Sequence, residues 1–130
     1  MLTAENIMAG KMRLLIAVAL TIAITAPTSA QEKFENLKAQ KIRARVIGKD
    51  ITDGVHWSEY YRKDGALISV DMGTQRRGTW KIQGNKLCKS DGKNKELTCY
   101  EVWMSGDNIS LRLNKDDKYF VGVVEKHGGN

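Results

Sequence analysis

The sequence predicts a mainly β domain of the α+β class, in which a short N-terminal helix precedes an antiparallel meander of about seven strands that forms a small barrel or sandwich. Three observations carry this prediction: turn signals recur about every ten residues, a single helical segment precedes them, and two cysteines flank a polar loop. The chain has 130 residues with 42% hydrophobic and 28% charged residues, which suits one globular domain and excludes disordered and collagen-like chains.

Residues 1–30 have the three parts of a secretory signal peptide. Lys11 and Arg13 supply the positive start, the apolar run Leu14–Ala26 follows, and small residues up to Ala30 supply a cleavage site. The apolar run is too short to span a bilayer, which needs about 20 residues. No cysteine lies near the cut, which disfavours a lipid anchor. A buried N-terminal helix is the alternative interpretation, and Met12 is an alternative start to Met1.

Cleavage after Ala30 leaves residues 31–130 as a single β-rich domain of about 100 residues, enough to bury an adequate core. Its first element is expected to be a helix over Asn36–Ile47, because Ile42 and Val46 form an apolar i, i+4 pair. Gly48 follows where a helix end favours a residue that adopts a positive φ.

After Gly48 the apolar period changes from helical to alternating. Asp64-Gly65 and Gly84-Asn85 are turn signals, and Gly73–Arg77 is expected to be a polar connection. Odd positions of Ile109–Leu113 are apolar and even positions polar, which indicates one dry and one wet face. The strands are expected at His56–Arg62, Ala66–Met72, Gly78–Gln83, Lys86–Lys89, Leu97–Ser105, Ile109–Leu113 and Tyr119–Glu125.

Cys88 and Cys99 are the two cysteines of the chain, and both lie after the signal peptide. An even count in an exported protein predicts one disulfide, here closing a polar loop across a hairpin. In the chain-entropy model such a bridge contributes roughly 2–3 kcal/mol. A redox pair or a zinc site is the alternative, but the C-x-x-C spacing is absent and no second ligand pair exists.

Four motifs occur in order: W-S-E-Y-Y-R-K-D-G at Trp57–Gly65, G-T-W at Gly78–Trp80, L-C at Leu87-Cys88 and C-Y-E-V-W at Cys99–Trp103. This order resembles small exported bacterial β-rich proteins of unknown function with a W-x-x-Y-Y-x-x-D-G, G-x-W, L-C and C pattern. The resemblance covers about Leu37 to Leu113. It implies a compact periplasmic β-rich domain with a Cys88–Cys99 bridge, and it carries over no activity.

No catalytic, metal or cofactor motif is present, so we expect a protein that is not an enzyme and binds no metal or cofactor. His127 lies in a Gly-rich tail where no rigid surroundings are expected to hold it. His56 and Glu59 are three residues apart in a strand, on opposite faces, which disfavours an acid–base pair. A facing pair among Glu59, Asp64, Asp71 and Glu101 is disfavoured because glycosidase domains are usually larger.

The net charge of +6 is the one remaining feature of the sequence that indicates a class of partner. Export and the absence of an aromatic–basic motif exclude nucleic acid, so the candidate polyanions are lipopolysaccharide, anionic lipids, acidic polysaccharides and acidic proteins. The alternative is that the charge only confers solubility. The candidate polyanion-binding residues are Lys38, Lys41, Arg43, Arg45, Arg76 and Arg77.

The leading hypothesis is a non-enzymatic, periplasmic or secreted binding domain that recognises an envelope component or a protein. The alternative is a small-molecule binder of the lipocalin type, with inhibition of a hydrolase such as lysozyme as a further one. The candidate ligand-lining residues are aromatic, with core packing as their alternative role: Trp57, Tyr60, Tyr61, Trp80 and Trp103.

Overall fold

The computed structural model describes residues 23, 26, 33–117 and 120–128, so the signal peptide predicted over residues 1–30 lies, apart from residues 23 and 26, outside the described residues. Residues 31–130 form one compact unit. Its elements are β1 (Glu35–Asn36), α1 (Ala39–Val46), β2 (Lys49–Thr52), β3 (Trp57–Tyr61), β4 (Ala66–Asp71), β5 (Thr74–Gln83), β6 (Lys86–Ser90), β7 (Thr98–Ser105), β8 (Asn108–Arg112) and β9 (Phe120–Lys126).

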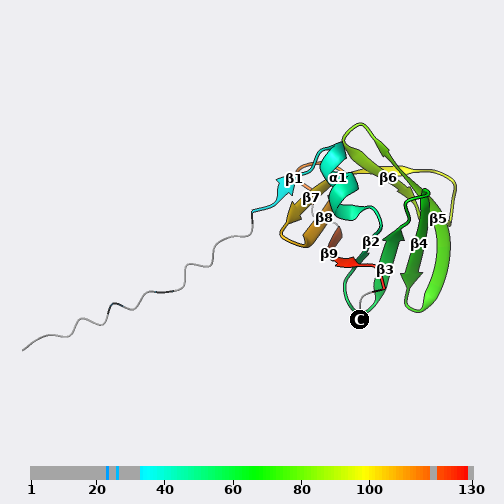
Figure 1. Ribbon diagram of the computed structural model, residues 1–130, viewed down its shortest axis with the longest axis horizontal. Helices are drawn as coiled ribbons and strands as arrows, with labels where there is room; N and C mark the ends of the chain where they lie inside the picture. The colour runs from blue at the N-terminus through cyan, green and yellow to red at the C-terminus, as the bar shows by residue number, and fades with distance from the viewer. Residues whose placement is uncertain (1–22, 24–25, 27–32, 118–119, 129–130) are drawn as a thin grey trace, which may run out of the picture. The chain divides into compact units, whose positions relative to one another are not determined.

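The strands form a closed antiparallel barrel, which decides between the two predicted architectures (Figure 1). Each strand from β2 to β9 pairs with the next along the chain, and β2 pairs with β9 to close the ring of eight. The short strand β1 adds to β7 beyond the end of its pairing with β6. The predicted mainly β meander with one helix and one disulfide is therefore confirmed, and closure leaves few strand edges unpaired.

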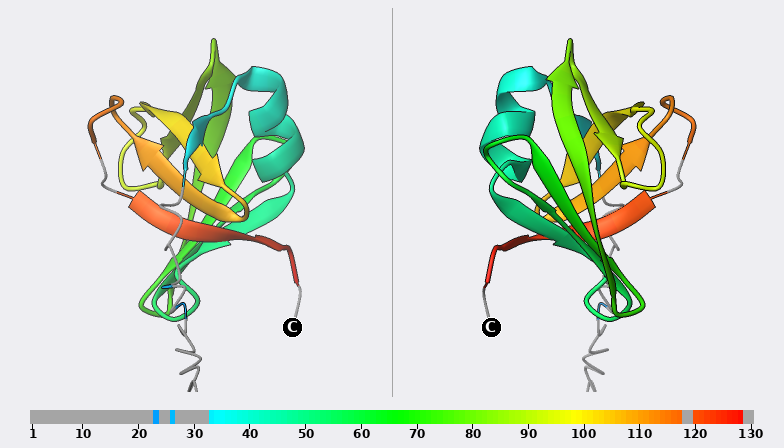
Figure 2. Two further views of the ribbon diagram at one scale, coloured as in Figure 1. Left: turned by 90° about the vertical axis from the view of Figure 1, so that its left-hand side faces the viewer. Right: turned by 90° about the vertical axis from the view of Figure 1, so that its right-hand side faces the viewer.

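Helix α1 covers one end of the barrel, beside the turns that join β3 to β4, β5 to β6 and β7 to β8 (Figures 1 and 2). The Ala39 N–H donates to Asn85 Oδ1 at 3.1 Å, and the Gly48 N–H donates to the Tyr61 carbonyl at 2.7 Å. Gly48 has a φ of +82°, as predicted for the residue after the helix. The buried Ile42 and Val46 face the barrel core. We call this the capped end and the opposite end, with the β2–β3 and β4–β5 turns, the mouth.

Three details of the predicted elements are wrong. The helix begins at Ala39 and not at Asn36, because Glu35 and Asn36 pair with β7 instead. Strand β2, which closes the barrel, was not predicted because its sequence is short and polar. Residues 74–77 are not a connection but the start of β5, which pairs with β4 as far as Asp71↔Thr74. Residues 74–77 are polar because their outward side chains are exposed to solvent and their inward side chains face the polar interior near the mouth.

The predicted Cys88–Cys99 disulfide is confirmed. The two residues are direct partners in the β6–β7 ladder and link the two ends of the polar β6–β7 loop. Cys88 is buried, on the outer side of the sheet relative to its neighbour Leu87. The bridge holds the loop, which borders the mouth of the barrel, against the body of the sheet.

Candidate functional site

The predicted polyanion-binding residues fall into two groups at opposite ends of the barrel. Lys38, Lys41, Arg43 and Arg45 lie on or beside α1 at the capped end, whereas Arg76 and Arg77 lie near the start of β5, close to the mouth. Arg77 is exposed on the outside, and Arg76, one residue earlier, points into the barrel and is half-buried. The structure therefore does not bring all six residues together.

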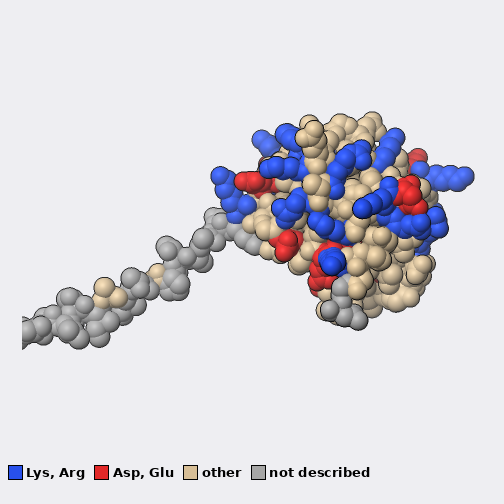
Figure 3. All heavy atoms as spheres, viewed as in Figure 1, with Lys and Arg blue, Asp and Glu red and all other residues tan. Residues whose placement is uncertain are grey.

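The capped end carries a dense group of cations (Figure 3). The exposed Lys63 lies in the β3–β4 turn and the exposed Lys86 at the start of β6, and both extend the positive surface of the helix. We call this surface the basic cap, and it consists of Lys38, Lys41, Arg43, Arg45, Lys63 and Lys86. One member of the cap has an acidic partner: the Asp107 carboxylate lies 3.6 Å from the Arg45 guanidinium and is 80% exposed. So exposed a pair offsets little of the cap's charge.

A groove of about 260 Å³ runs between α1 and the end of β7, at the edge of the basic cap. Lys33, Lys41 and Arg45 contribute three cations to its wall, and Glu35 contributes one carboxylate. The Arg45 guanidinium donates to the Gly106 carbonyl at 2.6 Å, which fixes its position in the groove. The groove therefore carries a net positive charge, and one of its cations, Arg45, is held in place by a hydrogen bond.

The predicted ligand-lining aromatic residues do not share one surface. Alternation along β3 turns Trp57 and Tyr61 into the barrel and Tyr60 outward. Trp80 is also buried, where its indole N–H donates to the Arg62 carbonyl at 2.7 Å and its ring meets Tyr61 edge-on. Trp103 lies on the outside, with the Arg112 guanidinium 4.6 Å from its ring centre. Tyr61 and Trp80 are core residues, which is the alternative role that the sequence left open.

A buried polar network, which no sequence motif indicated, crosses the barrel interior between β3 and β6. The Lys89 ammonium lies 2.6 Å and 2.8 Å from the two carboxylate oxygens of Glu59, and both side chains are 12% exposed. The Tyr61 hydroxyl donates to Glu59 Oε2 at 2.5 Å. Burial raises the pKa of the Tyr61 phenol well above its usual value, and the Glu59 charge adds to the rise, so Tyr61 stays a neutral donor.

One sequence signal could have located this network. Glu59 stands midway between Trp57 and Tyr61 in a strand, so a period of two places all three on one face. A carboxylate on the face that carries the large aromatic residues needs a cation inside the barrel. Nothing in the sequence singles out Lys89 among the many lysines as the partner of Glu59, because the two residues are 30 positions apart.

The mouth of the barrel contains a cavity of about 230 Å³, beyond the Glu59–Lys89 network. We call it the mouth cavity. Trp57 forms one wall and reaches past β2 to Gly122 on β9, where an added Cβ would lie 2.8 Å from the indole. Its inner-face lining is Trp57, Glu59, Ser69, Asp71 and Arg76, with Asp91 from the end of the β6–β7 ladder.

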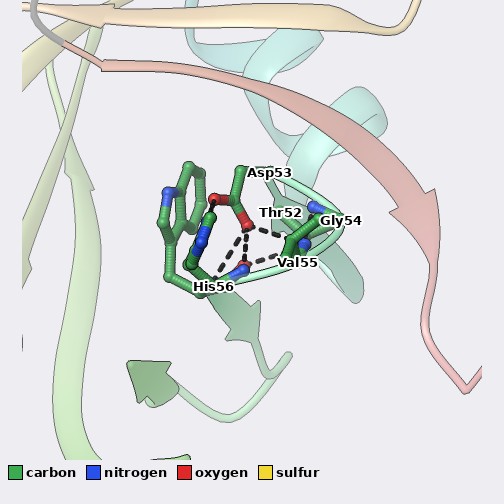
Figure 4. Close-up of polar contacts among 6 residues, drawn as sticks. Thr52, Asp53, Gly54, Val55 and His56 are labelled. Atoms are coloured by element: carbon green, nitrogen blue, oxygen red, sulfur yellow. Dashed lines mark hydrogen bonds and ion pairs between the residues drawn. The ribbon is translucent and has the colours of Figure 1, made fainter. Parts of the chain in front are cut away.

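The turn that joins β2 to β3 is organised by the carboxylate of Asp53 (Figure 4). Its Oδ1 accepts the N–H groups of Val55, His56 and Trp57 at 2.7–3.0 Å, and its Oδ2 lies 2.9 Å from His56 Nδ1. Burial raises the pKa of Asp53, but the three N–H donors and His56 outweigh it and hold the pKa well below its usual range. The turn positions Trp57 at the mouth cavity.

Replacing Asp53 with Ala should destabilise the protein at neutral pH. The loss of stability should become progressively smaller as the pH falls below 3.8, the ordinary pKa of an Asp side chain. A pKa that is lowered in the folded state contributes stability above the unfolded-state value and loses it as the pH falls through the folded-state value. Urea unfolding of both proteins between pH 7 and pH 2 measures this difference. Asp116→Ala is the control, because its exposed side chain makes no hydrogen bond or ion pair with the described residues. A difference independent of pH would contradict the role of the carboxylate.

The expectation that nothing holds His127 is wrong. Its Nδ1 lies 2.9 Å from Asp50 Oδ1, and its ring stacks on Tyr60 with centroids 3.4 Å apart. Strand β9 extends to Lys126 and pairs with β2, which brings the following residue beside β2 and β3. His56 likewise pairs with Asp53, so each histidine has its own carboxylate on the outside of the barrel.

Within residues 33–117 and 120–128, no three His, Cys, Asp or Glu side chains come together as a metal site would need. The same part of the chain has no helix with the length and apolar character that a membrane span requires. Comparisons with protein-family models, with curated proteins and with solved structures return no match.

Proposed function

We propose that this protein is an exported, non-enzymatic binding domain that recognises an anionic component of the cell envelope through its basic cap. The observation that carries the proposal is the availability of the cap's charges. The side chains of Lys38, Lys41 and Arg43 are exposed and make no hydrogen bond or ion pair with any other described residue. Uncompensated cations that gather on one face attract polyanions.

The groove beside α1 supports the same function. Its cations come from two elements, the segment before β1 and the helix, so they surround an anionic group instead of meeting it from one side. Phosphate and carboxylate groups of lipopolysaccharide, anionic lipids or acidic polysaccharides have this chemistry. Because the groups are exposed, binding should weaken as salt shortens the screening length, which is about 8 Å at physiological ionic strength.

Salt-gradient elution from immobilised heparin tests the proposal. The triple variant Lys38→Gln, Lys41→Gln, Arg43→Gln should elute at clearly lower salt than the unmodified protein, because it removes charges from the basic cap. The control triple variant Arg77→Gln, Lys95→Gln, Lys115→Gln loses the same charge from exposed residues outside the basic cap and should elute nearly unchanged. If both variants elute at equally lowered salt, retention depends on total charge and not on the basic cap. If none of the three proteins is retained on heparin, the proposal is wrong.

Export is tested separately, by mass spectrometry of the protein recovered from the envelope of an expressing bacterium. We expect an N-terminus at Gln31 and no free thiol, because cleavage follows Ala30 and the disulfide forms in an oxidising compartment. A chain that retains residues 1–30 would contradict export.

A small-molecule binder of the lipocalin type is the second candidate function. The closed barrel of eight antiparallel strands is compatible with it, and the mouth cavity is the observation that favours it. Towards the capped end, buried side chains such as Tyr61, Leu67 and Leu87 fill the interior, so a ligand would enter from the mouth.

A further inference from the structure

The mouth cavity contains a buried hydroxyl group that has no hydrogen-bonding partner in the part of the chain that the structure describes. Ser69 on β4 is 9% exposed, and its Oγ neither donates to nor accepts from any described group. A buried hydroxyl without a partner costs roughly 1–3 kcal/mol, so native structures rarely keep one. At a cavity wall, a ligand atom can satisfy it.

A guanidinium with no hydrogen-bond or ion-pair partner among the described residues stands next to this hydroxyl. Ser69 and Arg76 are direct partners in the β4–β5 ladder, so their side chains leave the sheet side by side on the inner face. Arg76 is half-buried, lines the mouth cavity and makes no hydrogen bond or ion pair with the described residues. Guanidinium groups bind carboxylates through two parallel hydrogen bonds.

The carboxylates around the cavity leave the Arg76 guanidinium available. Glu59 is the direct partner of Ser69 on its other side, but Lys89 and Tyr61 already occupy both of its oxygens. Asp91 Oδ1 accepts the Lys93 N–H, and the Lys93 side chain adds a cation to the same wall. Asp71 is exposed at the rim, where water screens its charge.

We infer that the mouth cavity binds a small organic carboxylate, with Arg76 holding the carboxylate, Ser69 donating its hydroxyl to it and Trp57 packing against the rest of the ligand. The volume of about 230 Å³ is below the roughly 300–1,000 Å³ of typical ligand pockets, which limits the ligand to a few functional groups. The site lies at the opposite end from the basic cap, so it stands whether or not the cap binds polyanions.

Benzoate is a suitable probe, because it joins one carboxylate to one flat apolar ring. Titration followed by amide chemical shifts and tryptophan fluorescence should give a Kd of about 1 mM, with shifts centred on β3, β4 and the start of β5. Benzamide keeps the ring and loses the charge, so it should bind about tenfold more weakly. Benzylamine, with the opposite charge, should cause no shift of these residues.

Arg76→Gln should weaken benzoate binding about tenfold, whereas Arg77→Gln removes the same charge one residue away on the outer face and should leave the Kd unchanged. Ser69→Ala should weaken benzoate binding severalfold without changing any charge. This variant therefore tests the site even if Arg76→Gln unfolds the barrel. Neither Ser69→Ala nor Arg76→Gln should alter heparin elution, which separates this site from the basic cap. Benzamide binding as tightly as benzoate, equal losses in Arg76→Gln and Arg77→Gln, or no shift at about 20 mM benzoate would each overturn the inference.

Discussion

Replacing Lys89 with Met should lower the free energy of unfolding by about 4 kcal/mol, because it leaves the Glu59 carboxylate inside the barrel without its cation. Both side chains are 12% exposed, so water cannot take the place of the lost ammonium. In a domain of about 100 residues this corresponds to a fall in Tm of roughly 20 °C. Thermal and urea unfolding of the two proteins measure the change.

The double variant Glu59→Gln, Lys89→Met should recover most of this stability, to within about 1 kcal/mol of the unmodified protein. The Gln removes the buried charge and keeps an oxygen that accepts the Tyr61 hydroxyl. Lys81→Met is the control: Lys81 is exposed on the outside of β5, and its loss should change stability by less than about 0.5 kcal/mol. A Lys89→Met protein as stable as the control would mean that the pair is not sequestered from water.

Gly78→Ala should also destabilise the protein by about 4 kcal/mol, for a steric reason. A Cβ at Gly78 would lie 1.7 Å from the Ser90 carbonyl oxygen and 2.9 Å from the Gly92 nitrogen. Both obstacles are backbone atoms, so no side-chain movement relieves the clash. The end of β6 and the loop after it would have to move away from β5, and the Thr79↔Ser90 pairing would be lost.

Gly84→Ala is the matched control for this prediction. An added Cβ at Gly84 meets nothing within 4 Å, so its cost is that of placing Ala at a φ of +59°, roughly 1 kcal/mol. Urea unfolding of both variants compares two losses of stability: one from a steric clash between neighbouring strands, the other from backbone strain alone. Equal losses of stability would contradict the close approach at Gly78.

Most of the fold follows from local signals in the sequence. Turn residues such as Asp64-Gly65 and Gly84-Asn85 set the strand boundaries, and Ile42 and Val46 set the buried face of the helix. Local signals were not sufficient for residues 74–77, which were predicted to be a connection and instead form the start of β5. They are polar because they lie at the mouth, and polarity alone does not separate a strand with a polar inner face from a loop.

The candidate sites depended more strongly on tertiary structure. The sequence identified Arg76 as a basic residue and Trp57 as an aromatic one, but their grouping with Ser69 comes from the pairing of β3, β4 and β5. The same pairing separates Arg76 from Arg77, which are neighbours in the chain and point to opposite faces. Lists of residues of one chemical type therefore mixed surface, core and cavity positions.

The sequence by itself determined most of the elements, their order, the partner of each cysteine and the excess of positive charge, because these depend on neighbouring residues or on simple counts. Only the tertiary structure decided that β2 and β9 close a ring, that Glu59 meets Lys89, and that one end is capped while the other holds a cavity. Those features arise from contacts between residues distant in the chain, and their geometry follows from strand register, which no short stretch of sequence specifies.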